Sequence, residues 1–219
     1  MIEDAVSSLP LPQRLALSYA PRASRNAFAG LFALDTRFAG IVRHAREPML
    51  AQMRLAWWRD VLAKPAAEWP TGEPLLALLA EWQGESAALC GLAEGWECLL
   101  AEPPFGASEI DGFAMGRAEC FAALTRLASM GERADDTRRA GRIWALADLA
   151  QGLGKPQERE SALAMARKEA GTRFRLPRAL RPALVLAGLA RRAVKRGGGD
   201  LLAGPADMLA ALRLGIMGR

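Results

Sequence analysis

Apolar residues recur at intervals of three and four along most of the chain, which is the spacing of one face of an α-helix. The clearest case is the stretch 31–62, LFALDTRFAGIVRHAREPMLAQMRLAWWRDVL, which reads as two helices that meet at residues 46–48. Because a proline ring fits the first turn of a helix, Pro48 is expected to open the second one. No stretch has the sustained alternation of a half-buried β-strand, and β-branched residues are few. The pattern therefore predicts an all-α protein.

Prolines and glycines divide the rest of the chain into further helices and the loops between them. The expected helices cover residues 12–19, 21 or 24 to 42, 48–62, 74–83, 85–100, 109–130, 135–153, 156–171, 177–196 and 205–214. Ser108 is expected to cap the helix that follows it, with Asp111 as the acid of a capping box. On the same helix, Gly112 and Gly116 lie four residues apart and predict the close approach of a neighbouring helix.

Length and composition favour one compact unit. The chain has 219 residues and is 51% hydrophobic, so we expect a single helical-bundle domain over residues 1–219. It contains no run of eighteen or more uncharged apolar residues, so no transmembrane helix is expected. The opening MIEDAVSSLPLP has two acids and no basic residue, unlike a secretory signal, and three cysteines are too few for a disulfide framework. These features favour the cytoplasm.

The net charge of +5 is distributed unevenly. Residues 1–59 carry eight basic and four acidic side chains, residues 60–111 carry one and ten, and residues 112–219 carry twenty and ten. The acidic segment 60–111 is therefore a candidate docking surface for a protein partner. A nucleic-acid-binding helical module is a third class of function, but it rests only on the isoelectric point of about 9.6, since no nucleic-acid-binding motif is present.

The stretch 31–62 resembles the N-terminal helices of the squalene/phytoene synthase family. Within it, REPMLAQMRLAWWRD most resembles a non-catalytic-looking branch of that family, which includes a mitochondrial assembly factor for respiratory complex I. The likeness is specific over residues 19–62 and weaker over 92–153, and RFRLP at 173–177 is similar to a later family motif. The resemblance implies a helical bundle of the isoprenoid synthase type, here shortened at its C-terminal end. In active members it implies the condensation of two prenyl diphosphates in isoprenoid biosynthesis, an alkyl-group transferase reaction.

The first acidic cluster of the active synthases is replaced in this chain. Matching the strings places Ala39, Gly40 and Arg43 at its positions, which leaves Asp35 as the one carboxylate on that helix. Several carboxylate oxygens are needed to hold the Mg²⁺ that neutralises a diphosphate leaving group. A lone aspartate is more typical of a solvated or arginine-paired residue, so no metal site and no cofactor are expected here.

The second metal-binding helix of the family is matched by AGRIWALADLAQGLGKP at 140–156. Gln151 and Gly152 stand where the family has an arginine and its first metal-binding aspartate. Asp148 is the one carboxylate that remains, and by itself it is typical of an exposed helical residue.

The resemblance and these replacements together imply a pseudoenzyme, a synthase-like protein that has lost Mg²⁺-dependent prenyl transfer. It would act as an assembly or lipid-handling factor near the respiratory membrane. Arg43, Arg46, Arg54 and Arg59 are expected near the mouth of its cavity, where they would bind a prenyl diphosphate or a lipid. Basic residues around the helix at 177–196 either complement the helix dipole or provide a peripheral contact with an anionic membrane.

The alternative is an active prenyl transferase in which Asp35 and Asp148 are catalytic and Mg²⁺ is the cofactor. In that case Asp60 and Glu119 would have to converge with them on a shared metal position.

Other chemistry is less favoured by the residues present. His44 is expected to meet the dipole at the end of its helix. The three cysteines are expected to be small buried residues and not zinc ligands, because structural zinc ligands come in close pairs.

Overall fold

The computed structural model describes residues 2–45, 47–171 and 175–218; Arg46 and residues 173–174 of RFRLP lie outside them. The described chain forms α-helices and short 3-10 turns, with no β-strand, which confirms the all-α prediction. The α-helices are α1 (Ile2–Ser7), α2 (Leu11–Ser18), α3 (Arg22–Arg43), α4 (Pro48–Leu62), α5 (Pro74–Leu78), α6 (Ser86–Glu97), α7 (Ala107–Leu127), α8 (Ala134–Gly152), α9 (Pro156–Ala170), α10 (Arg181–Lys195) and α11 (Pro205–Met217).

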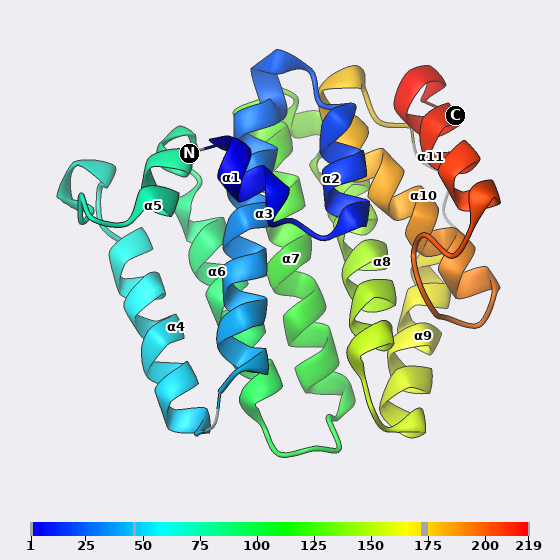
Figure 1. Ribbon diagram of the computed structural model, residues 1–219, viewed down its shortest axis with the longest axis horizontal. Coiled ribbons are helices and arrows are strands. Elements are labelled where there is room, and N and C mark those ends of the chain that lie inside the picture. The colour runs from blue at the N-terminus through cyan, green and yellow to red at the C-terminus, as the bar shows by residue number, and fades with distance from the viewer. Residues whose placement is uncertain (1, 46, 172–174, 219) are drawn as a thin grey trace.

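Helix α7 lies in the middle of the bundle (Figure 1). It packs against α6 on one side and α8 on the other, and α3 runs alongside it. Helix α4 stands at one edge of the molecule against α6, while α9, α10 and α11 extend the bundle beyond α8 to the opposite edge. The space between α3, α7 and α8 is covered by the short helix α2, so these four elements position the site described below.

Proline decides where many of these helices begin. It occupies one of the first two positions of α2, α4, α5, α9, α10 and α11, where its missing N–H has no intrahelical partner to lose. The capping prediction for α7 was wrong. The helix begins at Ala107 after Gly106, and the hydroxyl of Ser108 donates to the carboxylate of Glu109 instead of capping the helix. The helix expected at 74–83 is also shorter, because it tightens into a 3-10 turn at Ala80–Trp82.

The glycines of α7 confirm the predicted close approach of a neighbouring helix. A Cβ atom built on Gly116 would lie 2.6 Å from the carbonyl oxygen of Gly91 and 3.1 Å from the Cα atom of Gly95, both on α6. A Cβ on Gly112 would lie 2.7 Å from the sulfur of Cys98. Helices α6 and α7 therefore touch backbone to backbone, which only residues without a side chain allow.

Aromatic rings fill the centre of the core. Phe121 of α7 stacks on Trp144 of α8 with ring centroids 5.3 Å apart, and Phe28 and Phe32 of α3 pack against them. Five of the six tryptophans are buried, as expected for core residues, but Trp57 is 44% exposed. Among the described residues, no helix combines the length and the apolar character that crossing a membrane requires.

The acidic segment 60–111 is partly neutralised by ion pairs within the protein. Glu73, Glu85 and Glu97 pair with Arg37, Arg126 and Arg59, respectively. These pairs join the acidic segment to basic residues elsewhere in the chain, so the net charge of the segment overstates the negative potential that a partner would meet. Pairs on a protein surface contribute at most about 1 kcal/mol each.

Helix α11 is fastened to α10 through one buried aspartate. Asp207 accepts hydrogen bonds from Arg192 at 2.6 Å, from Arg196 at 2.9 Å and from the backbone N–H of Ala203 at 3.0 Å. Burial alone would raise the pKa of Asp207. The bonds from Arg192, Ala203 and Arg196 outweigh that effect, so the pKa lies below its ordinary value of 3.8.

We expect Asp207→Asn to lower the free energy of unfolding by about 1–2 kcal/mol at neutral pH, because charge-assisted hydrogen bonds are lost while both arginines remain partly solvated. A carboxylate with a depressed pKa stabilises the fold above its unfolded pKa, and this contribution disappears as the pH falls through the lower folded pKa. The difference in melting temperature between wild type and variant should therefore shrink below the ordinary pKa of 3.8. Asp200→Asn, at an exposed aspartate nearby, is the control and should show no such difference.

Candidate functional site: a buried arginine between two aspartates

Arg117 of α7 is the centre of the site. Its side chain is only 4% exposed. The guanidinium donates from Nε to Oδ1 of Asp35 at 2.9 Å and from Nη2 to Oδ2 at 2.8 Å, the two-pronged geometry that arginine makes with a carboxylate. Its third nitrogen, Nη1, donates to Oδ2 of Asp148 at 2.7 Å. One cation therefore joins α3, α7 and α8.

Aromatic side chains surround the guanidinium and fix its orientation. The central carbon of the guanidinium lies 4.4 Å from the ring centroid of Trp144, 4.6 Å from that of Phe113 and 5.3 Å from that of Trp96. The indole N–H of Trp96 donates to Oδ1 of Asp35 at 2.9 Å. Rings at these distances attract a cation through their negative faces, and the effect is strongest where water is excluded.

The charge state of the cluster follows from these contacts. Burial raises the pKa of Asp35 above its ordinary value, although the charge of Arg117 and the bonds from Arg117 and Trp96 oppose the rise. Burial would lower the pKa of Arg117, but Asp35 and Asp148 outweigh it and the pKa is raised. The guanidinium is therefore a permanent cation, and its pairing with the buried Asp35 matters most because an unpaired buried charge is costly.

A cavity of about 430 Å³ opens beside this cluster, between α3, α7 and α8. Its apolar wall consists of Ala39, Val42, Leu99, Phe105, Phe113, Leu149 and Leu153. Polar side chains also line it: Arg43 and Gln151 are exposed at its rim, whereas Gln13 is buried and Thr36 is half-buried. An apolar space with a few converging polar groups is typical of a small-molecule site, and the volume lies within the usual range of about 300–1,000 Å³.

Most of the positions that matched the family's metal-binding residues lie around this cavity. Ala39, Arg43 and Gly152 line it together with Asp35 and Asp148. Gly40 differs, because it lines a separate groove on the other side of α3. Asp35 and Asp148, the two aspartates singled out in the sequence, are 113 positions apart along the chain. Arg117 brings them together, because it donates hydrogen bonds to both.

The donor set does not fit Mg²⁺. This ion requires nearly octahedral oxygen ligands at about 2.0–2.1 Å. Both oxygens of Asp35 accept from Arg117, and so does Oδ2 of Asp148, so a guanidinium holds the space between the acids. The described residues contain no group of three or more His, Cys, Asp or Glu side chains suited to a metal ion.

The other residues of the two-metal alternative lie elsewhere. Asp60 is exposed on α4, and Glu119 pairs with Arg138. The cysteine sulfurs contact three separate backbone carbonyls, those of Arg59, Glu94 and Ala88. Neither set converges with Asp35.

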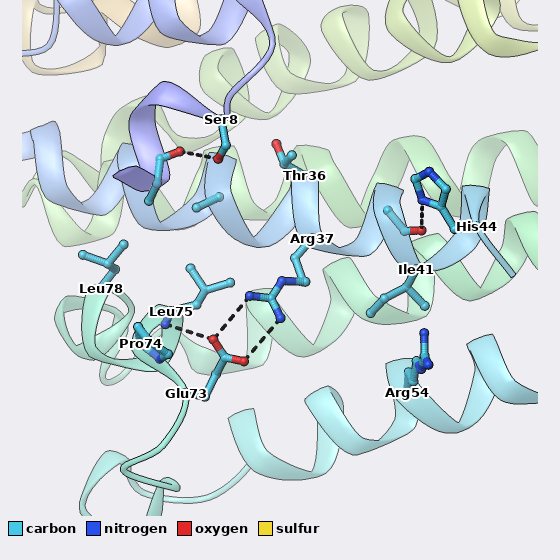
Figure 2. Close-up of a pocket in the computed structure, with 13 residues that line it drawn as sticks. Ser8, Thr36, Arg37, Ile41, His44, Arg54, Glu73, Pro74, Leu75 and Leu78 are labelled. Carbon is cyan, nitrogen blue, oxygen red and sulfur yellow. Dashed lines mark hydrogen bonds and ion pairs between the residues drawn. The ribbon is translucent and has the colours of Figure 1, made fainter. Parts of the chain in front are cut away.

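The second hollow is a groove of about 710 Å³ along the outer side of α3 (Figure 2). Its walls come from α1, α3, α4 and α5. Arg37 spans the middle, with guanidinium nitrogens 3.3 and 3.4 Å from the carboxylate of Glu73. Beyond it, His44 and Arg54 lie at one end, and Leu75 and Leu78 lie at the other.

Of the four arginines predicted at the cavity mouth, the three that the structure describes do not gather there. Arg43 lines the cavity, whereas Arg54 lines the groove on the opposite side of α3. Arg59 pairs with Glu97 at 3.3 Å and lines neither hollow. Arg46 lies outside the described residues. His44 behaves as expected, because it ends α3 and its Nδ1 lies 2.9 Å from the carbonyl oxygen of Gly40.

Arg117, the residue that organises the site, is not among the residues predicted from the sequence. A signal was present, because Arg117 lies four residues after Phe113 and three before Cys120, on the stripe that buries α7. A charged residue in such a stripe predicts a buried ion pair.

Compared with protein-family models, curated proteins and solved structures, the chain has no match.

Proposed function

We propose that this chain is a squalene/phytoene synthase-like protein that has lost Mg²⁺-dependent prenyl transfer. It acts as an assembly or lipid-handling factor near the respiratory membrane, and its central cavity holds an isoprenoid or lipid chain. The observation that carries the proposal is the position of Arg117. A guanidinium bonded to Asp35 and Asp148 takes up the oxygens that a metal ion would need.

Binding of an apolar chain is supported by the composition of the cavity. Leu99, Phe105 and Leu149 offer apolar surface, and Arg43 provides a cation at the rim. A prenyl diphosphate would place its chain against the leucines and its anionic head near Arg43. Transfer of the chain out of water drives such binding, at about 25 cal/mol per Å² of buried apolar surface.

The alternative remains an active prenyl transferase, with Mg²⁺ as cofactor and Asp35 and Asp148 as catalytic residues. One observation favours it, namely that these two aspartates reach the same cavity. For that reaction Arg117 would have to release both acids. Separating a buried ion pair costs free energy, so the active prenyl transferase is the less favoured of the two functions.

A thermal-shift titration with farnesyl diphosphate, with and without Mg²⁺, tests the proposal. Ligand binding to the folded state stabilises it by about 2.7 kcal/mol at a hundredfold excess over the dissociation constant. We expect a rise in melting temperature that is the same with and without Mg²⁺, and no hydrocarbon product on extraction. A rise that depends on Mg²⁺, accompanied by a new hydrocarbon, would establish the alternative. No rise under either condition would refute binding in the cavity.

A pair of glycine variants locates the ligand. A Cβ atom on Gly152 would meet no atom within 4 Å, so a leucine there has room at its first carbon and is expected to fill the edge of the cavity. Gly40→Leu is equally free of contacts but fills the groove on the other side of α3. We expect Gly152→Leu to abolish the thermal shift and Gly40→Leu to retain it.

A further inference from the structure

The groove on the outer side of α3 is polarised along its length. Leu75 and Leu78 make one end apolar, whereas His44 and Arg54 lie at the other end beside Ile41 (Figure 2). Among the side chains that the structure describes, Glu73 is the one acid in the lining, and it is already bonded to Arg37. The groove therefore suits a ligand with an anionic head and an apolar tail.

The basic groups at the polar end are available to a ligand. A carbonyl oxygen can only accept, so Nδ1 of His44 donates to the carbonyl of Gly40, and Nε2 can donate to an anion when the ring carries both protons. Arg54 is exposed and forms no ion pair within the described chain. The bonds from Arg37 to Glu73, at 3.3 and 3.4 Å, are longer than the usual 2.7–3.2 Å and are easily exchanged.

Helix α4 exposes several apolar side chains on the surface beside the groove. Met49, Leu50, Met53 and Trp57 are 71, 49, 63 and 44% exposed, respectively. At about 100° of rotation per residue they lie within roughly 100° of the helix circumference, on a face that is next to Arg54. Apolar surface of this kind, bordered by cations, matches the boundary between the headgroups and acyl chains of an anionic bilayer.

We propose that the α3–α4–α5 groove binds one anionic membrane lipid, with its phosphate at His44 and Arg54 and an acyl chain running toward Leu75 and Leu78. The exposed face of α4 rests on the bilayer from which the lipid enters. The groove volume of about 710 Å³ lies within the usual range of about 300–1,000 Å³ for ligand sites and suits the phosphate with one acyl chain, while the second chain stays in the bilayer. The groove shares Thr36 with the central cavity, but the residues proposed to contact the lipid line the groove alone, so this proposal does not depend on the function proposed for the cavity.

The chain supplies its own control for the electrostatic part of the proposal. MLAQMRLAW at 49–57 on α4 is repeated as MLAALRLGI at 208–216 on α11. Both copies expose the same four apolar positions and the arginine that follows the third of them. The copies lie at opposite edges of the molecule, and only Arg54 of the two arginines borders the groove (Figure 1).

Flotation with vesicles tests whether the protein binds anionic lipid through Arg54. We expect the protein to bind vesicles of phosphatidylcholine with phosphatidylglycerol and to bind phosphatidylcholine alone weakly. Arg54→Glu should weaken the binding to anionic vesicles roughly tenfold or more, because each cation near such a surface contributes about 1 kcal/mol and its charge is reversed. Arg213→Glu, the same change in the second copy, should leave the binding unaltered. Equal losses in both variants, or binding that ignores phosphatidylglycerol, would overturn the proposal.

Occupancy of the groove is tested by lipid extraction. Protein separated from anionic vesicles is extracted with organic solvent, and bound phosphatidylglycerol is counted per chain. We expect Gly40→Leu to lose the lipid and Gly152→Leu to keep it. The reverse result would place the lipid in the central cavity and refute the groove, whereas no bound lipid in the wild type would refute capture altogether. The function proposed above is judged separately, by the response to farnesyl diphosphate.

Discussion

Replacing Asp35 with alanine is expected to lower the free energy of unfolding by about 3–5 kcal/mol. The change leaves Arg117 almost fully buried with only Asp148 as a charged partner. It also removes the acceptor of the Trp96 indole N–H. Removing one partner of a buried ion pair costs more than the pair contributes, because the remaining charge keeps its desolvation penalty. Urea unfolding followed by tryptophan fluorescence measures the loss.

Two further variants separate this mechanism from a simple loss of packing. Asp148→Ala removes a carboxylate that bonds the same guanidinium but is 35% exposed, so we expect a loss of only about 1 kcal/mol. The double variant Asp35→Leu with Arg117→Met removes both buried charges and should recover most of the stability lost in Asp35→Ala. If the double variant is less stable than Asp35→Ala, the ion pair stabilises the fold in its own right, and the desolvation of an unpaired Arg117 does not account for the loss.

Replacing Gly116 with valine is expected to lower the free energy of unfolding by about 3 kcal/mol, the upper end of the usual cost of overpacking a core. Its first added carbon would lie 2.6 Å from the carbonyl oxygen of Gly91 and 3.1 Å from Cα of Gly95. Both contacts are with backbone atoms, which cannot rotate away as a flexible side chain would. Helices α6 and α7 would have to separate, and Trp96 of α6 would then move relative to Arg117.

Gly91→Ala is the matched control on the facing helix. A Cβ atom on Gly91 would meet nothing within 4 Å, and alanine is favoured over glycine in a helix by about 1 kcal/mol. We therefore expect this variant to be as stable as the wild type or slightly more stable, measured by the same urea titration. A similar destabilisation at both positions would mean that any side chain added between these helices is costly, and the close contact at Gly116 would not explain the result.

The ion cluster and the glycine contact have a shared consequence for the cavity. Arg117 ties α3 and α8 to α7, and Gly116, one residue earlier, sets the distance from α7 to α6. The cavity wall is thus held by one short segment of α7. Variants in this segment are expected to affect ligand binding and stability together, whereas Gly152→Leu should affect binding alone.

The amino-acid sequence by itself determined the class and most of the elements of this protein. Apolar spacing of three and four residues fixes helices because it depends only on local geometry. Proline fixes several starts because its ring and its missing N–H act within the same turn. The predicted helix boundaries at Ser108 and at 80–82 were wrong because the apolar pattern does not report where a helix ends. A cap or a 3-10 turn depends on small differences between local hydrogen bonds.

Which side chains meet depends on how distant helices pack against one another. Periodicity places a residue on a buried or exposed face, but it does not say what the facing helix presents. Arg117 therefore finds Asp35, 82 residues away, and Asp148, 31 residues away. For the same reason Arg43 and Arg54 do not meet, although both were expected at the mouth of the central cavity. Arg43 lines that cavity, whereas Arg54 lines the groove on the other side of α3. The position of a charge along the chain is local information, whereas its partner is set by the packing of distant helices.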